Sequence, residues 1–251
     1  MRIPIAIILF TAACAPRAAT VVDSPAPGAV DAPAPVAVDT TRPIPNDIHW
    51  VRSSAEYRAL TLQTYRAATA RARALAQGRA PGSWAVILDA DETVIDNTEY
   101  QRRIAVRGLR YDTASFHAWA RERAAVIVPG ADAFIHEVQR LGGRVAIVTN
   151  RDEPVCEDTR ANLEQVGIRD ALVLCRVAGV SDKNPRYRAV AEGTAGRPPA
   201  AVLVWVGDNI QDFPELRQDA RGREDGLDLF GDRYFMLPNP MYGSWESLPR
   251  R

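Results

Sequence analysis

The chain has 251 residues, a length that accommodates one ordinary domain with a small appended cap. Its 47% hydrophobic and 25% charged residues are typical of a soluble globular protein. Basic and acidic side chains number 31 each, and this balance excludes the basic surface that binds nucleic acid polymers or other polyanions. Of the basic residues 30 are arginine, so Lys183 is the only lysine in the sequence.

Residues 1–13 are predicted to be a signal peptide. Arg2 precedes an apolar run over 3–10, which is too short to span a bilayer but suits the hydrophobic region of a signal peptide. Small residues directly before Cys14 resemble a bacterial lipobox, whose cysteine becomes lipidated; an ordinary cleaved signal with a chance cysteine is the alternative. Residues 14–47, rich in Ala, Pro, Val and Asp, are predicted to be a flexible tether. The sequence therefore predicts a lipoprotein anchored to a membrane of the bacterial cell envelope, facing the periplasm or the cell surface.

A helix is predicted directly after the tether. Ser53 and Glu56 have the spacing of a capping box, and Gly78 follows the last helical residues. Five later segments are predicted to be strands, because short apolar runs without polar alternation are typical of parallel strands buried on both faces. They lie at 84–93, 144–150, 171–175, 201–209 and 233–239.

Helical patterns alternate with these strands. One helix is predicted after Pro129 and ends at Gly142; another is predicted from Asp152, as N-cap, to Gly167. This alternation predicts an α/β fold, a doubly wound, Rossmann-like parallel sheet, over residues 48–251. A small, mainly helical cap is predicted from the N-terminal helix and the polar segment 96–128, which is dotted with the aromatic residues Tyr100, Tyr111, Phe116 and Trp119.

Polar side chains stand at the carboxyl ends of the predicted strands, where open α/β sheets bind ligands. They are Asp89 and Asp91 after the first strand, Thr149 and Asn150 at the end of the second, and Asp208 and Asp212 after the fourth. Four carboxylates without histidine or cysteine ligands favour Mg²⁺. A phosphoryl substrate would also need a fixed cation, because carboxylates repel an anion, and Lys183 can supply it.

Two other kinds of site are disfavoured. A calcium loop starting at Asp89 would need glycine where Val94 stands and glutamate where Tyr100 stands. A serine nucleophile elbow starting at Gly179 lacks its second glycine. Within the first aspartate motif, Asp96 either shapes the loop or is solvated, and the sequence leaves both open.

Four motifs in this order resemble the haloacid dehalogenase superfamily of aspartate-nucleophile phosphatases. They are DADETVIDN at 89–97, IVTNR at 147–151, the lysine at 183 and GDNIQDF at 207–213. IHWVRSSAEYRALTLQTY at 48–65 and FMLPNPMYGSWE at 235–246 narrow the resemblance to class C nonspecific acid phosphatases, including the outer-membrane lipoprotein 5′-nucleotidase type. The resemblance covers nearly all of residues 46–250 and implies a Mg²⁺-dependent phosphomonoesterase.

The resemblance also implies roles for individual residues. Asp89 would be the nucleophile that forms an aspartyl-phosphate, and Asp91 would protonate the leaving alkoxide and then activate water. Lys183 would neutralise the nucleophile and the transferring group. Thr149 would donate a hydrogen bond to a phosphoryl oxygen, and Asn150 would shape the loop around it. Asp208 would bind Mg²⁺ together with Asp89 and the backbone carbonyl of Asp91, and Asp212 would orient the metal ligands. Tyr242 would stack on the nucleobase.

Several alternatives stay open at this point. The same aspartyl-phosphate would allow phosphoryl transfer to an alcohol, and an inactive binding protein of this fold is a second alternative. The predicted substrates are small phosphate monoesters of nucleotides, aryl alcohols or sugars, and a homodimer is left open. Cys156 and Cys175 either form a disulfide, which an exported protein permits, or are two buried thiols.

Overall fold

The computed structural model describes residues 43–193, 196–223 and 226–250. The predicted signal peptide, Cys14 and the tether up to residue 42 lie outside these ranges. The first helix, α1 (Asn46–Ser53), starts within the last residues assigned to the tether. None of the helices within the described ranges combines the length and the apolar composition that a membrane span requires.

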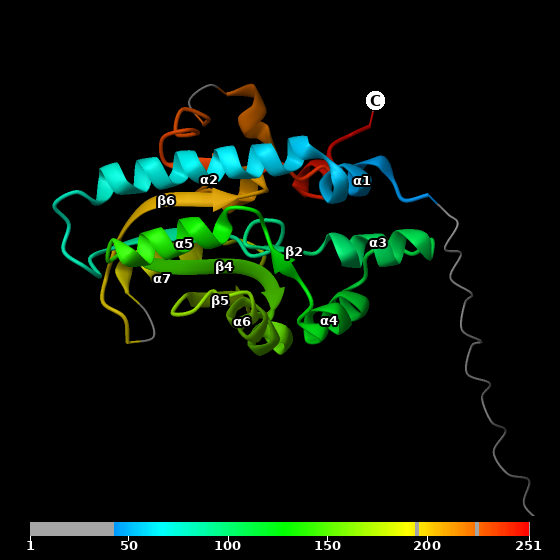
Figure 1. The fold of residues 1–251 in the computed structure, drawn as a ribbon, viewed down its shortest axis with the longest axis horizontal. Helices are drawn as coiled ribbons and strands as arrows, with labels where there is room; N and C mark the ends of the chain where they lie inside the picture. The colour runs from blue at the N-terminus through cyan, green and yellow to red at the C-terminus, as the bar shows by residue number, and fades with distance from the viewer. Residues whose placement is uncertain (1–42, 194–195, 224–225, 251) are drawn as a thin grey trace, which may run out of the picture. The chain divides into compact units, whose positions relative to one another are not determined.

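The centre of the fold is a five-stranded parallel sheet with the strand order β5-β4-β1-β6-β7 (Figure 1). Its strands are β1 (Trp84–Leu88), β4 (Arg144–Asp152), β5 (Leu172–Arg176), β6 (Ala201–Gly207) and β7 (Tyr234–Met236). The chain moves from β1 outward to β5 on one side, then crosses to β6 and β7 on the other. The predicted doubly wound α/β sheet is confirmed, and its five strands are those expected from the apolar segments.

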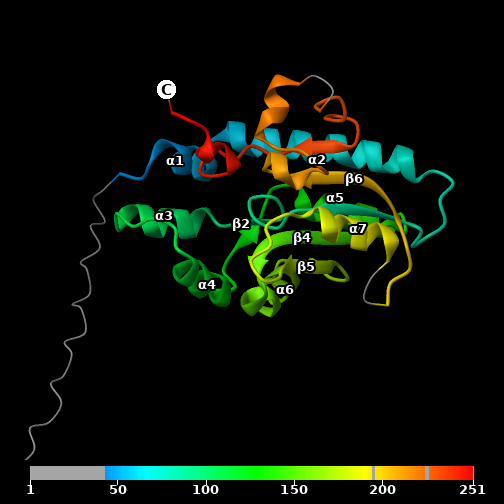
Figure 2. The ribbon, with the colours of Figure 1, turned by 180° about the vertical axis from the view of Figure 1, so that it is seen from behind.

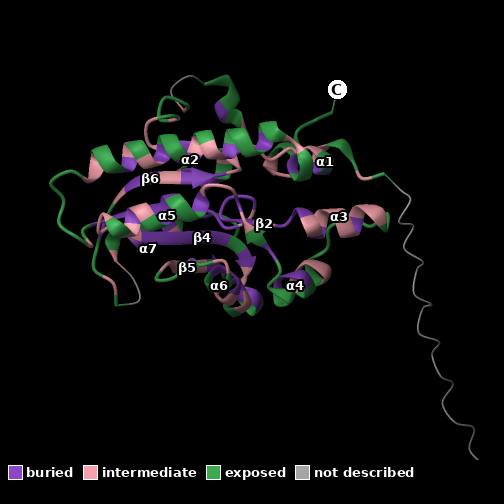
Figure 3. Cartoon of the chain, in the orientation of Figure 1, coloured by how far each residue is buried: buried purple, intermediate pink, exposed green. Residues whose placement is uncertain are grey.

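The central strand β1 is buried on both faces, as its unbroken apolar sequence predicts. The neighbouring strand β4 is also mostly buried (Figure 3). Val86 and Leu88 belong to a core cluster with side chains of α2 (Ala55–Ala76), α5 (Ala131–Arg140) and α6 (Cys156–Gln165). Ala85 and Ile87, on the opposite face, pack with α7 (Asn184–Glu192), which Figure 2 shows from its own side. Helices thus cover both faces of the sheet.

Two predicted helix starts are wrong in detail. Ser53 ends α1 and does not cap the long helix; Ser54 is extended, and its hydroxyl accepts a hydrogen bond from Tyr57 N at 3.0 Å, which makes Ser54 the N-cap of α2. Asp152 is the last residue of β4, and its carboxylate makes no cap hydrogen bond to the short 3₁₀ turn η1 (Glu153–Val155) that precedes α6. The Asp152 carboxylate instead pairs with Arg176 at 2.7 Å.

The cap predicted from segment 96–128 is mainly helical. It contains α3 (Thr98–Val106), α4 (Thr113–Glu122) and a two-stranded antiparallel ladder of β2 (Ile95–Asp96) with β3 (Val126–Ile127). The Tyr100 ring packs against Tyr111, Phe116 and Trp119 with centroid distances of 6.4, 5.3 and 6.4 Å. The predicted N-terminal helix corresponds to α2, which packs against α5, β6 and β7. The helix that contacts α3 is α1, which was not predicted.

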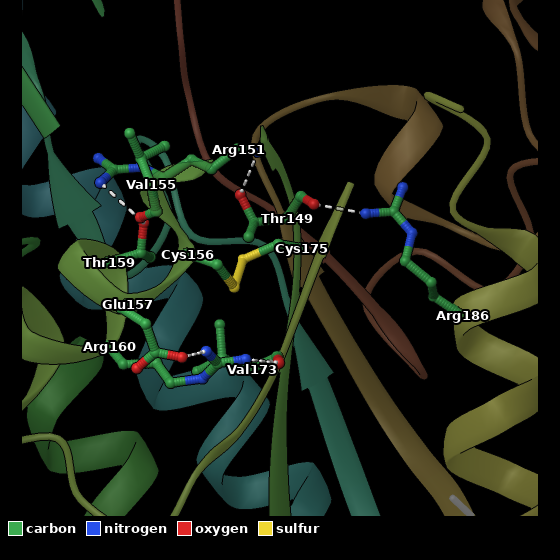
Figure 4. Close-up of a disulfide and its surroundings, with 10 residues drawn as sticks. All are labelled: Thr149, Arg151, Val155, Cys156, Glu157, Thr159, Arg160, Val173, Cys175 and Arg186. Atoms are coloured by element: carbon green, nitrogen blue, oxygen red, sulfur yellow. Dashed lines mark hydrogen bonds and ion pairs between the residues drawn. A yellow bond between two sulfur atoms is a disulfide. The ribbon is translucent and has the colours of Figure 1, made fainter. Parts of the chain in front are cut away.

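A disulfide joins Cys156, the first residue of α6, to Cys175 in β5 (Figure 4). The two Cα atoms are 6.0 Å apart, within the range that disulfides require. The structure therefore decides between the two alternatives left open by the sequence. Because β5 is an edge strand, the disulfide ties the edge of the sheet to the helix that packs against it.

We expect this disulfide to contribute substantially to stability, because it closes a loop with a sequence separation of 19 residues. Such a loop corresponds to about 3 kcal/mol of unfolding free energy, or roughly 6 to 12 °C in Tm for a domain of this size. Thermal unfolding with and without dithiothreitol measures the effect. The double variant Cys156→Ala/Cys175→Ala, which keeps Cys14, should be destabilised and insensitive to the reductant. A wild-type Tm that reductant leaves unchanged would contradict this contribution.

Candidate active site

The strand order places the ends of β1 and β6 side by side. Asp89 follows β1 and Asp208 follows β6, and the backbone N–H of Asp89 donates to the carbonyl of Val206 at 3.0 Å. The chain reverses its direction across the sheet at these neighbouring strands, which is where α/β sheets form ligand-binding crevices. The topology alone therefore brings the predicted strand-end carboxylates together.

Lys183 lies at the centre of this arrangement with only 5% of its surface exposed. Its Nζ donates to Asp89 Oδ1 at 2.5 Å and to Asp212 Oδ1 at 2.7 Å. Burial lowers the pKa of the Lys183 ammonium, but the charges of Asp212 and Asp89 outweigh it, so the net shift is upward. The side chain is therefore a buried, permanently charged cation.

Carboxylate oxygens of Asp89, Asp208 and Asp212 all lie within 4.8 Å of one another. Burial raises the pKa of the Asp89 carboxyl to about 7; Lys183 opposes this shift, and Asp212 and Asp91 add to it. Burial, followed by the charges of Asp212 and Asp89, also raises the pKa of Asp208 well above its usual range. Burial is thus the main cause of both pKa shifts, and the negative charge of the neighbouring carboxylates adds to it.

These three oxygen donors fit a hard divalent cation. Carboxylate groups are the ligands that Mg²⁺ prefers, and a divalent charge would balance the excess that Lys183 leaves. Asp208 is further oriented by Thr93 Oγ1 at 3.2 Å and by Asn239 Nδ2 at 2.8 Å, one at each carboxylate oxygen. The Asp91 side chain is not part of this carboxylate cluster.

Asp212 makes hydrogen bonds through both of its carboxylate oxygens. Its Oδ2 accepts from Asn209 N at 2.8 Å in the capping box of the 3₁₀ turn η2 (Ile210–Asp212), while Oδ1 accepts from Lys183. Gly207 allows this approach, because a Cβ at that position would lie 2.3 Å from Asp212 Cβ. The turn therefore holds the carboxylate against the end of β6.

Asp91 faces a different set of partners. Its Oδ1 accepts from Asn97 Nδ2 at 2.7 Å and from Arg151 Nε at 2.9 Å. Asp96 shapes the loop between them, since its Oδ1 accepts from Thr98 N at 2.6 Å at the start of α3. The question left open for Asp96 by the sequence is thus answered in favour of loop shaping.

Thr149 and Asn150 lie inside β4, which extends two residues beyond its predicted end. Thr149 is fully buried, and its Oγ1 accepts from Arg151 N at 3.0 Å, which leaves the hydroxyl hydrogen free to donate. Asn150 is exposed, and its Oδ1 accepts from Arg186 Nη2 at 2.7 Å. Arg186 Nη1 also donates to the Thr149 carbonyl, as Figure 4 shows. Arg186 of α7 therefore holds Thr149 and Asn150 in place through two hydrogen bonds.

A cavity of about 750 Å³ opens over these residues. Seven of the predicted site residues line it, and Thr149 does not; the seven are Asp89, Asp91, Asn150, Lys183, Asp208, Asp212 and Tyr242. Aromatic side chains from the cap and from the C-terminal segment also line it: Tyr111, Phe116 and Tyr242. The half-buried Tyr242 packs beside the apolar cluster of α1, α2 and Met241. Its stacking role stays a prediction.

Comparison with known proteins agrees with this geometry. Residues 29–245 match the family described as HAD superfamily, subfamily IIIB (acid phosphatase). The chain belongs to this acid phosphatase family. It is similar to the class C acid phosphatase of Bacillus anthracis, solved with tungstate bound, at 27% identity and a TM-score of 0.71 over 80% of this chain and 85% of that one. A second structure of the Bacillus anthracis enzyme gives 26% identity and a TM-score of 0.69 with the same coverage. The protein is therefore a phosphomonoesterase with the haloacid dehalogenase fold.

Sequence reasoning missed several residues of this acid phosphatase site. Arg151 and Asn97, which contact Asp91, both stand inside the recognised motifs but received no role. Asn239, which contacts Asp208, stands in the C-terminal motif. Their position within the recognised motifs is the signal that could have identified them.

For this acid phosphatase, we expect Lys183→Arg to lower kcat/KM at least tenfold, about 1.4 kcal/mol, although the charge is kept. The reason is shape: a compact ammonium sits between two carboxylates at 2.5 and 2.7 Å, and a wide planar guanidinium has no room there. Arg188→Lys, an exchange on the exposed face of the same helix α7, is the matched control. Near-normal steady-state kinetics of Lys183→Arg would contradict the requirement for lysine.

Proposed function

We propose that this acid phosphatase is Mg²⁺-dependent and hydrolyses small phosphate monoesters through an aspartyl-phosphate on Asp89. The observation that carries the proposal is the buried Asp89 carboxylate, which is paired with Lys183 and close to Asp208 and Asp212 beneath an open cavity. Because the nucleophilic carboxylate and the phosphoryl group are both negatively charged, the main requirement of the site is positive charge around them.

Asp89, Asp208 and Asp212, with the backbone carbonyl of Asp91, would hold the Mg²⁺ ion. When bound, the ion supplies positive charge that offsets the repulsion between the carboxylates and the phosphoryl oxygens. The rest of the site can be described from the chain's own residues. Lys183 contributes the second positive charge. The proposed hydrogen bond from Thr149 to a phosphoryl oxygen requires its fully buried hydroxyl to turn toward the cavity, which Thr149 does not line.

The reaction then proceeds in two steps. In the first, a carboxylate oxygen of Asp89 forms a bond to phosphorus while the bond to the ester oxygen breaks, and Asp91 gives its proton to the departing alkoxide. In the second, Asp91 takes a proton from water, whose oxygen attacks phosphorus and releases Asp89 and inorganic phosphate. Asp91 lines the cavity but does not belong to the carboxylate cluster. This position suits a residue that exchanges protons with the leaving group.

We further propose 5′-nucleotides and small aryl or sugar phosphates as substrates. The cavity volume of about 750 Å³ is in the range of pockets for small molecules. Tyr111 and Phe116 of the cap and Tyr242 of the C-terminal segment offer aromatic surface for a base or an aryl group. The tungstate in the Bacillus anthracis relative, a tetrahedral oxyanion like phosphate, supports binding of such a group by this fold.

The proposed location is the bacterial cell envelope, with a lipid on Cys14. The N-terminal sequence carries this part of the proposal, through its signal-like segment and its lipobox-like residues before Cys14. The disulfide between Cys156 and Cys175 supports it, because such bonds persist in exported proteins.

A phosphate-release assay tests the proposed function. We expect release from at least one of NMN, AMP, phosphotyrosine, glucose 6-phosphate and p-nitrophenyl phosphate, loss of that activity with EDTA, and recovery with excess Mg²⁺. Asp89→Asn should abolish turnover, whereas Asp219→Asn, at an exposed carboxylate, should leave it unchanged. No release from any substrate would contradict the enzyme, and full activity in EDTA would contradict the metal.

A further inference from the structure

The hydrogen bonds of Asp91 are confined to one of its two carboxylate oxygens. Oδ1 accepts from Asn97 Nδ2 at 2.7 Å and from Arg151 Nε at 2.9 Å, and Arg151 Nη2 lies 2.8 Å from it. Among the residues that the structure describes, none of the hydrogen bonds of Asp91 ends on Oδ2. Oδ1 accepts two hydrogen bonds and lies against the guanidinium, so Oδ2 is the oxygen left to carry the acid proton.

The Arg151 side chain is buried and contacts several neighbouring side chains. It has no exposed surface. Nη2 donates to Asn97 Oδ1 at 2.8 Å, Nη1 to Thr159 Oγ1 at 3.4 Å, and the guanidinium lies 5.3 Å from the centroid of the Phe116 ring. A planar fork with this many contacts cannot swing away from Asp91 without breaking several of them.

Asn97 connects this arginine to the cap. Its Oδ1 accepts from Trp119 Nε1 of α4 at 2.8 Å as well as from Arg151, so its Nδ2 must point toward Asp91. Its backbone N–H donates to Glu92 Oε1 at 2.8 Å, which fixes the residue that carries the amide. The orientation of the amide is thus set by a donor on the cap and a donor on β4.

We propose that Arg151, Asn97 and Trp119 are positioning residues for the acid–base step. They hold Asp91 Oδ1 so that Oδ2 presents the proton to the leaving oxygen, and Arg151 stabilises the carboxylate that remains after the transfer. This inference rests on the proposed role of Asp91. It makes leaving-group protonation depend on a cap residue, Trp119, that contacts neither Asp89 nor Asp91.

Leaving-group dependence separates this role from a merely structural one. A p-nitrophenolate leaves readily without a proton, whereas an alkoxide, such as that of glycerol 2-phosphate, needs one. A loss of acid positioning should therefore lower kcat for alkyl esters much more than for activated aryl esters. General damage to the site would lower both equally.

The experiment measures kcat and KM for p-nitrophenyl phosphate, phenyl phosphate and glycerol 2-phosphate, with thermal unfolding of each variant. Asp91→Asn sets the reference for complete loss of the acid. For Arg151→Lys we expect a loss on glycerol 2-phosphate at least about tenfold larger than on p-nitrophenyl phosphate, mainly in kcat. For Trp119→Phe, which removes one hydrogen bond and keeps an aromatic ring, we expect a difference of about threefold.

Arg103→Lys is the matched control, because Arg103 lies 5.0 Å from the Trp119 ring and pairs with Glu99 and Glu122 but does not touch Asp91. It should lose equally little on all three esters. If Arg151→Lys fails to fold, Trp119→Phe still decides the question. Equal losses on all esters in both variants, beside a selective loss in Asp91→Asn, would overturn the positioning role and leave the proposed function standing. Equal losses in Asp91→Asn itself would overturn the acid role along with it.

Discussion

The ammonium of Lys183, buried between Asp89 and Asp212, is the interaction on which the rest of the site depends. Removing an ammonium from water costs several kcal/mol unless charged partners replace the water. The fold supplies those partners from two different strand ends, and it begins α7 directly after the lysine. The side chains are therefore not free to rearrange: each is held by an element whose position the sheet determines.

The site has more negative than positive charge, and this excess matters for its chemistry. Asp89, Asp208 and Asp212 bring three negative charges to a region where Lys183 provides one positive charge. Burial, with the negative charge of the neighbouring carboxylates added to it, raises the pKa values of Asp89 and Asp208. Because the fold holds these carboxylates together despite their repulsion, the cluster suits a divalent cation. With that cation bound, the site also suits an anionic phosphoryl group.

Asp91 stands beside this cluster in a different electrostatic setting. Its charge is matched by a buried arginine, and Asn97 links that arginine to the cap. The two carboxylates of the motif DADET, only two residues apart, thus face different partners: Asp89 faces lysine and carboxylates, and Asp91 faces guanidinium and amide. One strand end thus presents two carboxylates in different surroundings, which suits the separate roles of nucleophile and acid that we propose for them.

The sheet and the strand-end carboxylates could be predicted from the sequence because both follow from local patterns and topology. Unbroken apolar runs identify buried parallel strands, and parallel strands present their carboxyl ends at one edge. The contacts of Arg151 could not be predicted, because they join side chains of the loop after β1, of α4 and of α6 that are far apart in the sequence. The two predicted helix caps differ from the structure for similar reasons. Ser54, the next residue, caps α2 in place of Ser53, and the Asp152 carboxylate accepts a hydrogen bond from the distant Arg176 and not from the start of a helix.

The central claim is that the phosphoryl group passes to Asp89. The most direct test is to mix the enzyme with a phosphorus-labelled aryl phosphate, quench in acid and map the label on peptides. The account predicts label on the peptide that contains Asp89, removable by hydroxylamine and absent from Asp89→Asn. Label on any other residue, or turnover at the normal rate with no labelled protein in the pre-steady state, would contradict it.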